Sequence, residues 1–278
     1  MQPFAVIFDF NGTMLFDTPL QYQAWNMIAE QTIGKSIGID TFLRTANGRS
    51  SAETVDIFWG KSLTKDEKQA LISNKRQTYK HLCLTHPELF HLADGIPEVL
   101  DLLKKHNIPF TIATSSNPAS VDFYYEKLEL NRWFRREDIV CTDGSFRGKP
   151  APDIYCAAAK TLHMNPENCI VIEDAVAGAY AARGAGIGYI VIIDPEDSGL
   201  IWVGEQVDCV IQEHEQLYEM LCQRMKEKKS RASYTADVFF MPKIPRKIPA
   251  SSLGLLITTT FIRQTPFRRS NVRQCRQQ

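Results

Sequence analysis

The feature that most constrains the fold is a regular alternation of short apolar runs with helical patterns from Asp94 onward. Each run is rich in β-branched residues and has the pattern of a buried strand. With the run near the N-terminus, the predicted strands are Phe4–Phe8, Phe110–Ala113, Asp138–Cys141, Cys169–Ile172, Tyr189–Ile193 and Val207–Ile211. Strands that alternate with helices pair in parallel through right-handed crossovers. We therefore predict an α/β protein whose parallel sheet is covered by helices, two of them at about Pro152–Leu162 and Ala175–Arg183.

One segment interrupts this alternation. No convincing strand pattern occurs between residues 16 and 90, where Tyr22, Trp25 and Ile28 instead have helical spacing. A helical segment placed after the first strand of a parallel sheet would form a cap over the core. We predict that residues 16–90 form this helical cap and that residues 1–15 and 91–223 form the core.

The C-terminal segment, residues 224–278, differs from both parts. It holds 13 Lys and Arg residues against only Glu227 and Asp237, although Lys+Arg and Asp+Glu are 32 each in the whole chain. From residue 230 onward it combines prolines and a Ser/Thr-rich patch with no periodicity that could bury a face. It lacks the interleaved aromatic residues that are typical of nucleic-acid binding and the amphipathic pattern that is typical of membrane binding. We expect a largely disordered basic tail without nucleic-acid or membrane partners.

Cysteine usage and hydropathy indicate the compartment. The seven cysteines are scattered without CxxC spacing, which is typical of free thiols in a reducing compartment. No secretory signal precedes the first strand, and the apolar run Leu253–Ile262 is too short to span a bilayer. We expect a cytoplasmic, monomeric protein.

Chemically distinct side chains follow the predicted strands. Asp9 comes directly after the first strand and precedes Gly12, which permits a sharp turn. Thr114, Lys149 and the pair Glu173-Asp174 lie near the ends of later strands or in the loops between them; these residues are expected to meet at the carboxyl edge of the sheet. Asp9 could attack phosphorus, Asp174 could bind Mg²⁺ with it, and Thr114 and Lys149 could contact phosphate oxygens. The set predicts phosphoryl transfer.

These residues occur in four ordered motifs that resemble those of the haloacid dehalogenase (HAD) superfamily, over roughly residues 4–222. The motifs are Asp9-Phe10-Asn11-Gly12-Thr13, Ile112-Ala113-Thr114-Ser115-Ser116, Gly148-Lys149-Pro150-Ala151-Pro152-Asp153 and Val171-Ile172-Glu173-Asp174. The cap position resembles the helical-cap branch, which includes β-phosphoglucomutase, sugar-phosphate phosphatases and phosphoglycolate phosphatase. The resemblance implies a Rossmann-like core with a mobile helical cap and an aspartyl-phosphate intermediate on Asp9.

The resemblance also implies a set of site residues. The catalytic residues would be Asp9, Asn11, Thr114 and Lys149; substrate would contact Gly12, Arg49, Ser115 and Ser116; and Mg²⁺ would be held by Asp9, Asn11, Glu173 and Asp174. At position 11 the metal contact would come from the backbone carbonyl. Arg49 belongs to the cap loop and is a candidate for binding a distal phosphate or a sugar hydroxyl, although an exposed arginine at a helix start is nearly as compatible with the sequence.

Asn11 departs from the family pattern, in which phosphatases and mutases have an Asp that exchanges protons with the leaving group. An amide cannot do this at neutral pH. Three interpretations remain open: a substrate with a good leaving group, an acid/base group from the cap or from Glu173, or a slow phosphatase or phosphate-dependent binding protein.

Two further positions narrow the reaction class. Phosphonate cleavage in this family needs a cap lysine that forms an imine, and Arg49 cannot form one. Gln21 stands where mutase-like members often have His, so a second proton-handling group is missing. We therefore favour a Mg²⁺-dependent phosphatase of a small phosphorylated metabolite, with a sugar phosphate as the expected substrate. The alternatives are a phosphohexomutase and a catalytically weakened regulatory protein.

Overall fold

The structure is a computed structural model that describes residues 4–195 and 206–238. Of these residues, 4–195 and 206–224 belong to one compact unit and 225–238 belong to a second. All of the candidate site residues belong to the first unit.

The first unit contains one parallel sheet of six strands, which confirms the predicted fold class. The strands are β1 (Ala5–Phe8), β2 (Phe110–Thr114), β3 (Val140–Cys141), β4 (Cys169–Glu173), β5 (Tyr189–Ile193) and β6 (Cys209–Ile211). Their order is β3-β2-β1-β4-β5-β6, so the chain reverses direction across the sheet at β1. Ile7 pairs with Thr111 on one side and with Val171 on the other. This reversal opens a crevice at the carboxyl ends of the central strands, where sheets of this type bind ligands.

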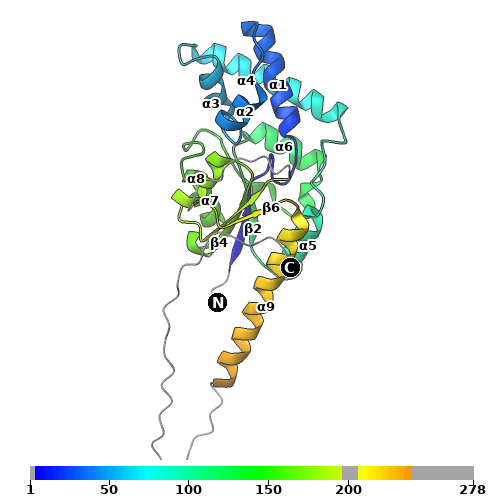
Figure 1. The fold of residues 1–278 in the computed structure, drawn as a ribbon, viewed down its shortest axis with the longest axis vertical. Helices are drawn as coiled ribbons and strands as arrows, with labels where there is room; N and C mark the ends of the chain where they lie inside the picture. Colours follow the sequence, from blue (N-terminus) through cyan, green and yellow to red (C-terminus); the bar gives the residue numbers. More distant parts are fainter. Residues whose placement is uncertain (1–3, 196–205, 239–278) are drawn as a thin grey trace, which may run out of the picture. The chain divides into compact units, whose positions relative to one another are not determined.

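Helices cover both faces of the sheet, which explains why β1 is buried throughout. The core helices are α5 (Ile96–Lys105), α6 (Pro118–Lys127), α7 (Asp153–Thr161) and α8 (Val176–Gly184), with short 3₁₀ turns at Leu130–Arg132, Arg136–Asp138 and Pro166–Asn168. Helices α7 and α8 pack on each other and on the strands, and α5 lies across the sheet from them (Figure 1). The apolar core between α7, α8 and the sheet includes Ile7, Tyr155 and Val171.

The segment between β1 and α5 is helical, as the sequence predicted. It contains α1 (Thr18–Ile33), α2 (Ile39–Thr45), α3 (Ser51–Phe58) and α4 (Lys65–Thr85). Local sequence sets the helix starts: Ser50 and Thr64 each form a capping box with the glutamate three residues later. The cap has its own apolar cluster, built around Trp25, Phe42 and Val55.

The last helix includes the first residues of the segment that the sequence predicts to be largely disordered. Helix α9 extends from His214 to Val238, so this segment is helical from residue 224 to Val238. Helix-favouring Glu, Gln, Lys, Arg and Met residues explain this without an apolar periodicity. The rest of the predicted tail, residues 239–278, lies outside the described residues. None of the helices that the structure describes is long and apolar enough to cross a membrane.

Candidate active site

Asp9 lies one residue beyond β1, at the carboxyl edge of the sheet. Its backbone N–H donates to the carbonyl of Ile172 at 2.9 Å, which ties the loop to β4. Only 5% of the residue is exposed. Burial raises the pKa of the Asp9 carboxyl, and the positive charge of Lys149 opposes that increase. Asp9 is therefore a buried carboxyl group with an adjacent cation.

Lys149 connects Asp9 to Glu173. Its Nζ donates to Oδ1 of Asp9 and to Oε1 of Glu173, the second contact at 2.6 Å. Burial alone would lower the pKa of this fully buried ammonium group, but the two carboxylates outweigh burial and the pKa lies above its ordinary value. Lys149 is consequently positively charged at neutral pH.

Glu173 uses both of its carboxylate oxygens within the protein. Oε1 accepts from Lys149 and from the Tyr155 hydroxyl at 2.7 Å, and Oε2 accepts from the backbone N–H groups of Asp174 and Ala175, each at 2.9 Å. The carboxylate is fully buried. This arrangement makes Glu173 the residue that orients Lys149.

Asp174 lies over the turn that follows Asp9. Its Oδ1 accepts from the Thr13 hydroxyl at 3.3 Å, and its Oδ2 accepts from the amide of Asn47 at 3.1 Å. Gly12 has a φ of +88°, and a Cβ at this position would lie 2.1 Å from Oδ2 of Asp174. Only glycine therefore allows the turn to approach this carboxylate.

Three carboxylates, those of Asp9, Glu173 and Asp174, could hold a metal ion, because one oxygen from each lies within 4.8 Å of the others. The pKa of Asp174 is raised by burial first and then by the charges of Glu173 and Asp9. Lys149 supplies one positive charge to three acidic groups. The donor set and its excess of negative charge fit a hard divalent cation.

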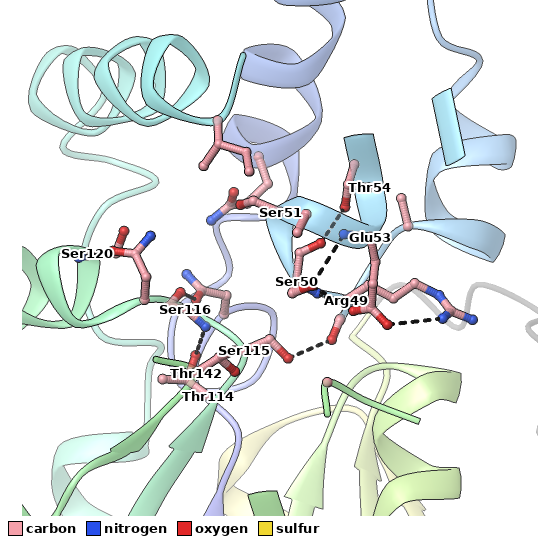
Figure 2. A pocket seen from close by; sticks show the side chains of 18 of the residues that line it. Arg49, Ser50, Ser51, Glu53, Thr54, Thr114, Ser115, Ser116, Ser120 and Thr142 are labelled. Atoms are coloured by element: carbon pink, nitrogen blue, oxygen red, sulfur yellow. Dashed lines mark hydrogen bonds and ion pairs between the residues drawn. The ribbon is translucent and has the colours of Figure 1, made fainter. Parts of the chain in front are cut away.

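The last residue of β2 and the residues after it present hydroxyl groups to the site. Thr114 is buried, and its hydroxyl oxygen accepts from the Ser116 backbone N–H at 3.1 Å. Ser115 donates to the carbonyl of Gly48 in the cap loop at 2.9 Å (Figure 2). The segment thus connects the core to the cap as well as facing the site.

Asn11 is held by three neighbours. Its amide nitrogen donates to Oδ2 of Asp17 at 2.8 Å and to the Tyr124 hydroxyl at 3.2 Å, and its carbonyl oxygen accepts from the Ser116 hydroxyl at 2.9 Å. Both ends of the amide therefore have partners. This hydrogen bonding fixes the orientation of a side chain that carries no exchangeable acid proton.

Sequence reasoning missed Asp17, which is fully buried where the chain enters the cap. Its Oδ2 also accepts from the Gln21 amide at 2.7 Å and from the Tyr79 hydroxyl, while its Oδ1 has no hydrogen-bond partner in the described chain. Burial raises its pKa, against the hydrogen bonds from these donors. Its position directly before Thr18-Pro19, where the predicted cap begins, was the available sequence signal.

A second buried lysine, Lys75 of α4, was also missed. Its Nζ donates to Oε1 of Gln21 and lies 5.3 Å from the ring centre of Trp25 and 4.8 Å from that of Tyr79. Burial lowers its pKa to about 8. Lys75 therefore differs from Lys149 in having neutral neighbours in direct contact.

Arg49 lies on the cap side of the site, as expected (Figure 2). Its guanidinium contacts Glu53 at 3.9 Å, and about 31% of its side chain is exposed. The preceding Gly48 has a φ of +75°, and a Cβ there would lie 2.5 Å from that of Ala175. The loop can lie against the core only because this position lacks a side chain.

A cavity of about 650 Å³ lies between cap and core. Six of the predicted site residues line it: Asp9, Asn11, Arg49, Thr114, Ser115 and Ser116. Four do not, namely Gly12, Lys149, Glu173 and Asp174. Apolar and aromatic side chains of the cap, including Trp25, Phe42 and Ile72, complete the lining. The volume is that of a small-molecule site.

Comparison with known proteins identifies the family. The family model described as a haloacid dehalogenase-like hydrolase matches residues 5–186. Beta-phosphoglucomutase of Bacillus subtilis is 35% identical over 188 residues, which cover 66% of this chain and 80% of that protein. Phosphorylated carbohydrates phosphatase of Thermotoga maritima is 30% identical over 183 residues, with coverage of 66% and 82%.

Solved structures agree with this result. A HAD hydrolase of family IA, variant 3, from Entamoeba histolytica has a TM-score of 0.68 and 34% identity, covering 76% of this chain and 94% of that one. Beta-phosphoglucomutase from Clostridium difficile shares the fold, with a TM-score of 0.67, 24% identity and coverage of 82% and 100%. The chain therefore belongs to the haloacid dehalogenase-like hydrolases.

Proposed function

We propose that this protein is a Mg²⁺-dependent phosphatase that hydrolyses a small sugar phosphate through an aspartyl phosphate on Asp9. The observation that carries the proposal is the ion pair of Lys149 with Asp9, the carboxyl group of the pair that lines a substrate-sized cavity. A carboxylate so placed can act as a nucleophile toward phosphorus. The relatives named above as a mutase and a carbohydrate phosphatase support the substrate class.

In the first step an Asp9 carboxylate oxygen forms a bond to phosphorus as the bond from phosphorus to the sugar oxygen breaks, and the departing sugar oxygen takes a proton from solvent water. In the second step a water molecule attacks the phosphorus, gives up a proton to solvent, and releases phosphate and the Asp9 carboxylate. The positive charge of Lys149 favours the ionised form of Asp9 against the effect of burial and offsets the negative charge of the transferring group, and Glu173 keeps Lys149 in place. Thr114 and the amides after it provide donors for phosphate oxygens.

Mg²⁺ would be held by Asp9, Asp174 and the backbone carbonyl of Asn11. When bound, it would neutralise phosphate charge and act as a Lewis acid. Glu173 was predicted from sequence as a further ligand. Because both of its oxygens accept hydrogen bonds from Lys149, Tyr155 and two backbone N–H groups, we propose that it positions Lys149 instead.

Asn11 limits the reaction. Its amide cannot donate a proton to the departing sugar oxygen, and acid/base assistance of this kind is typically worth about 10²–10⁴ in rate. A mutase must also return the phosphoryl group to a second hydroxyl, which requires proton transfer in both directions. Gln21 is an amide as well, and it contacts Asp17 and Lys75. These two amides favour hydrolysis over mutase activity.

The test measures phosphate release from a panel of sugar phosphates with Mg²⁺, using the native protein and Asn11→Asp. We expect measurable turnover by the native protein and faster turnover by the variant. Interconversion of hexose 1- and 6-phosphates is measured in parallel and is expected to be absent. If only Asn11→Asp shows turnover, the native protein is a weakened phosphate-binding protein and the hydrolase proposal is wrong.

A further inference from the structure

One face of the cap helix α4 borders the cavity. The lining residues are Gln69, Ile72, Lys75, Arg76 and Tyr79. Most of them recur at intervals of three and four positions, so they share one side of the helix. Arg76 is therefore on the side of α4 that faces the cavity from the cap, whereas Asp9 borders the same cavity from the core.

Among the described arginines that line the cavity, Arg76 is the one without a carboxylate partner. Arg147 is paired with Asp153 at 2.8 Å and Arg49 contacts Glu53 at 3.9 Å, while the neighbouring Lys75 donates to the neutral amide of Gln21. Arg76 has no ion pair within the part of the chain that the structure describes.

One side-chain nitrogen of Arg76 also lacks a hydrogen-bond partner in the described residues. This nitrogen is Nε, which is buried. The Nε of Arg183 is similar, but the guanidinium of Arg183 reaches Asp208 at 2.9 Å. The charge of Arg76 also contributes to lowering the pKa of Lys75, after the larger effect of burial. A buried N–H without an acceptor is unfavourable, and an anionic ligand would provide the missing acceptor and charge.

We propose that Arg76 binds a second anionic group on the substrate, at the cap end of the cavity, while the reacting phosphate lies at Asp9. The substrate class is then a phosphorylated sugar that also carries a phosphate or a carboxylate. This inference rests on the proposed function for the reacting end, but it concerns a different end of the cavity. A volume of about 650 Å³ leaves room for more than one phosphate.

The test uses three matched compounds: glucose 6-phosphate, 6-phosphogluconate, which adds a carboxylate, and glucose 1,6-bisphosphate, which adds a phosphate. Values of kcat and KM are measured for the full chain with Mg²⁺ and for Arg76→Gln, Arg76→Lys and the control Arg183→Gln. We expect the native protein to prefer at least one of the doubly anionic compounds. Arg76→Gln should lower that preference at least tenfold through KM, Arg76→Lys should lower it less, and Arg183→Gln should retain it.

Equal preference in the native protein and Arg76→Gln, or no preference in the native protein, would overturn the proposal. The doubly anionic compound that the native protein prefers shows whether Arg76 binds a carboxylate or a phosphate. If the native protein hydrolyses neither these three compounds nor any other of the sugar-phosphate panel, the proposed function fails. Calorimetry of the same three compounds then decides the binding claim separately. At least tenfold weaker binding of a doubly anionic compound to Arg76→Gln would then support it, and equal or undetectable binding would overturn it. Thermal melts establish that each variant is folded.

Discussion

Two lysines are buried in the described part of the chain, and their environments differ in one decisive respect. Lys149 lies between the carboxylates of Asp9 and Glu173, whereas Lys75 lies between two aromatic rings and a glutamine amide. The pKa of Lys149 is raised, and the pKa of Lys75 is lowered to about 8. Burial alone disfavours an ammonium group, so the adjacent carboxylates reverse the sign. The core thus stabilises a fixed charge beside the nucleophile, and the cap holds a charge that it disfavours.

The largest expected effect tests the acidic partner of Lys149. Asp9→Asn removes the nucleophile, and we expect at least about a 10⁴-fold loss of kcat in the phosphatase assay. Asp122→Asn, which changes an exposed aspartate paired with Arg136, serves as the control and should leave the rate unchanged. Full activity of Asp9→Asn would show that the Lys149 pair has no part in the chemistry.

Removing Lys149 itself should affect folding. In Lys149→Met, the carboxylates of Asp9 and Glu173 lose their cation while remaining buried, so we expect the free energy of unfolding to fall by about 3–5 kcal/mol at pH 7. Urea unfolding measures the difference. Lys160→Met, at an exposed lysine of α7, is the matched control. Equal stabilities of the two variants would mean that the ion pairs of Lys149 are energetically neutral.

Burial of Lys75 should make the free energy of unfolding rise with pH. Its pKa is about 8 in the folded state against 10.5 as the ordinary value, so between these pH values the unfolded state binds more protons and stability rises with pH. The rise should reach about 3 kcal/mol. It is measured as the difference in unfolding free energy between the native protein and Lys75→Met at pH 8 and at pH 10.5. A difference that does not change with pH would contradict a disfavoured charge.

Stabilisation by Mg²⁺ should depend on the carboxylates beside Lys149 and should not depend on Lys75. Mg²⁺ at about 100 times its dissociation constant should stabilise the native protein by about 2.7 kcal/mol, because it binds only the folded carboxylate cluster. Thermal melts with Mg²⁺ and with a chelator measure the effect. Lys75→Met should retain it, and Asp174→Asn should lose it. Equal melting with and without Mg²⁺ would exclude the metal site.

The sequence was sufficient for the fold and the family because both depend on local patterns. Apolar runs predicted each strand, and the order of four motifs predicted a HAD-like hydrolase, which the structure and the comparisons confirm. Apolar patterning did not indicate helix α9, because its sequence consists of helix-favouring polar residues without an apolar periodicity. The roles of the individual site residues stay predictions.

The contacts between cap and core could not be predicted, because no spacing in the sequence encodes them. Asn11 was identified as unusual, but its hydrogen bonds to Asp17, Tyr124 and Ser116 come from three separate segments. Lys75 and Arg76 were unremarkable positions in a long helix until the fold placed them at the cavity. Glu173 had the residue type of a metal ligand, and only the structure shows that its oxygens already have partners.

In the proposed mechanism Asp9 accepts the phosphoryl group beside Lys149, while Asn11 gives no proton to the leaving group. The most direct test of this mechanism is the dependence of kcat/KM on the pKa of the leaving group, measured with a series of phosphate monoesters. We expect the rate of the native protein to fall steeply as the leaving-group pKa rises, and the rate of Asn11→Asp to fall less steeply. Equal slopes for the two proteins would contradict the mechanism.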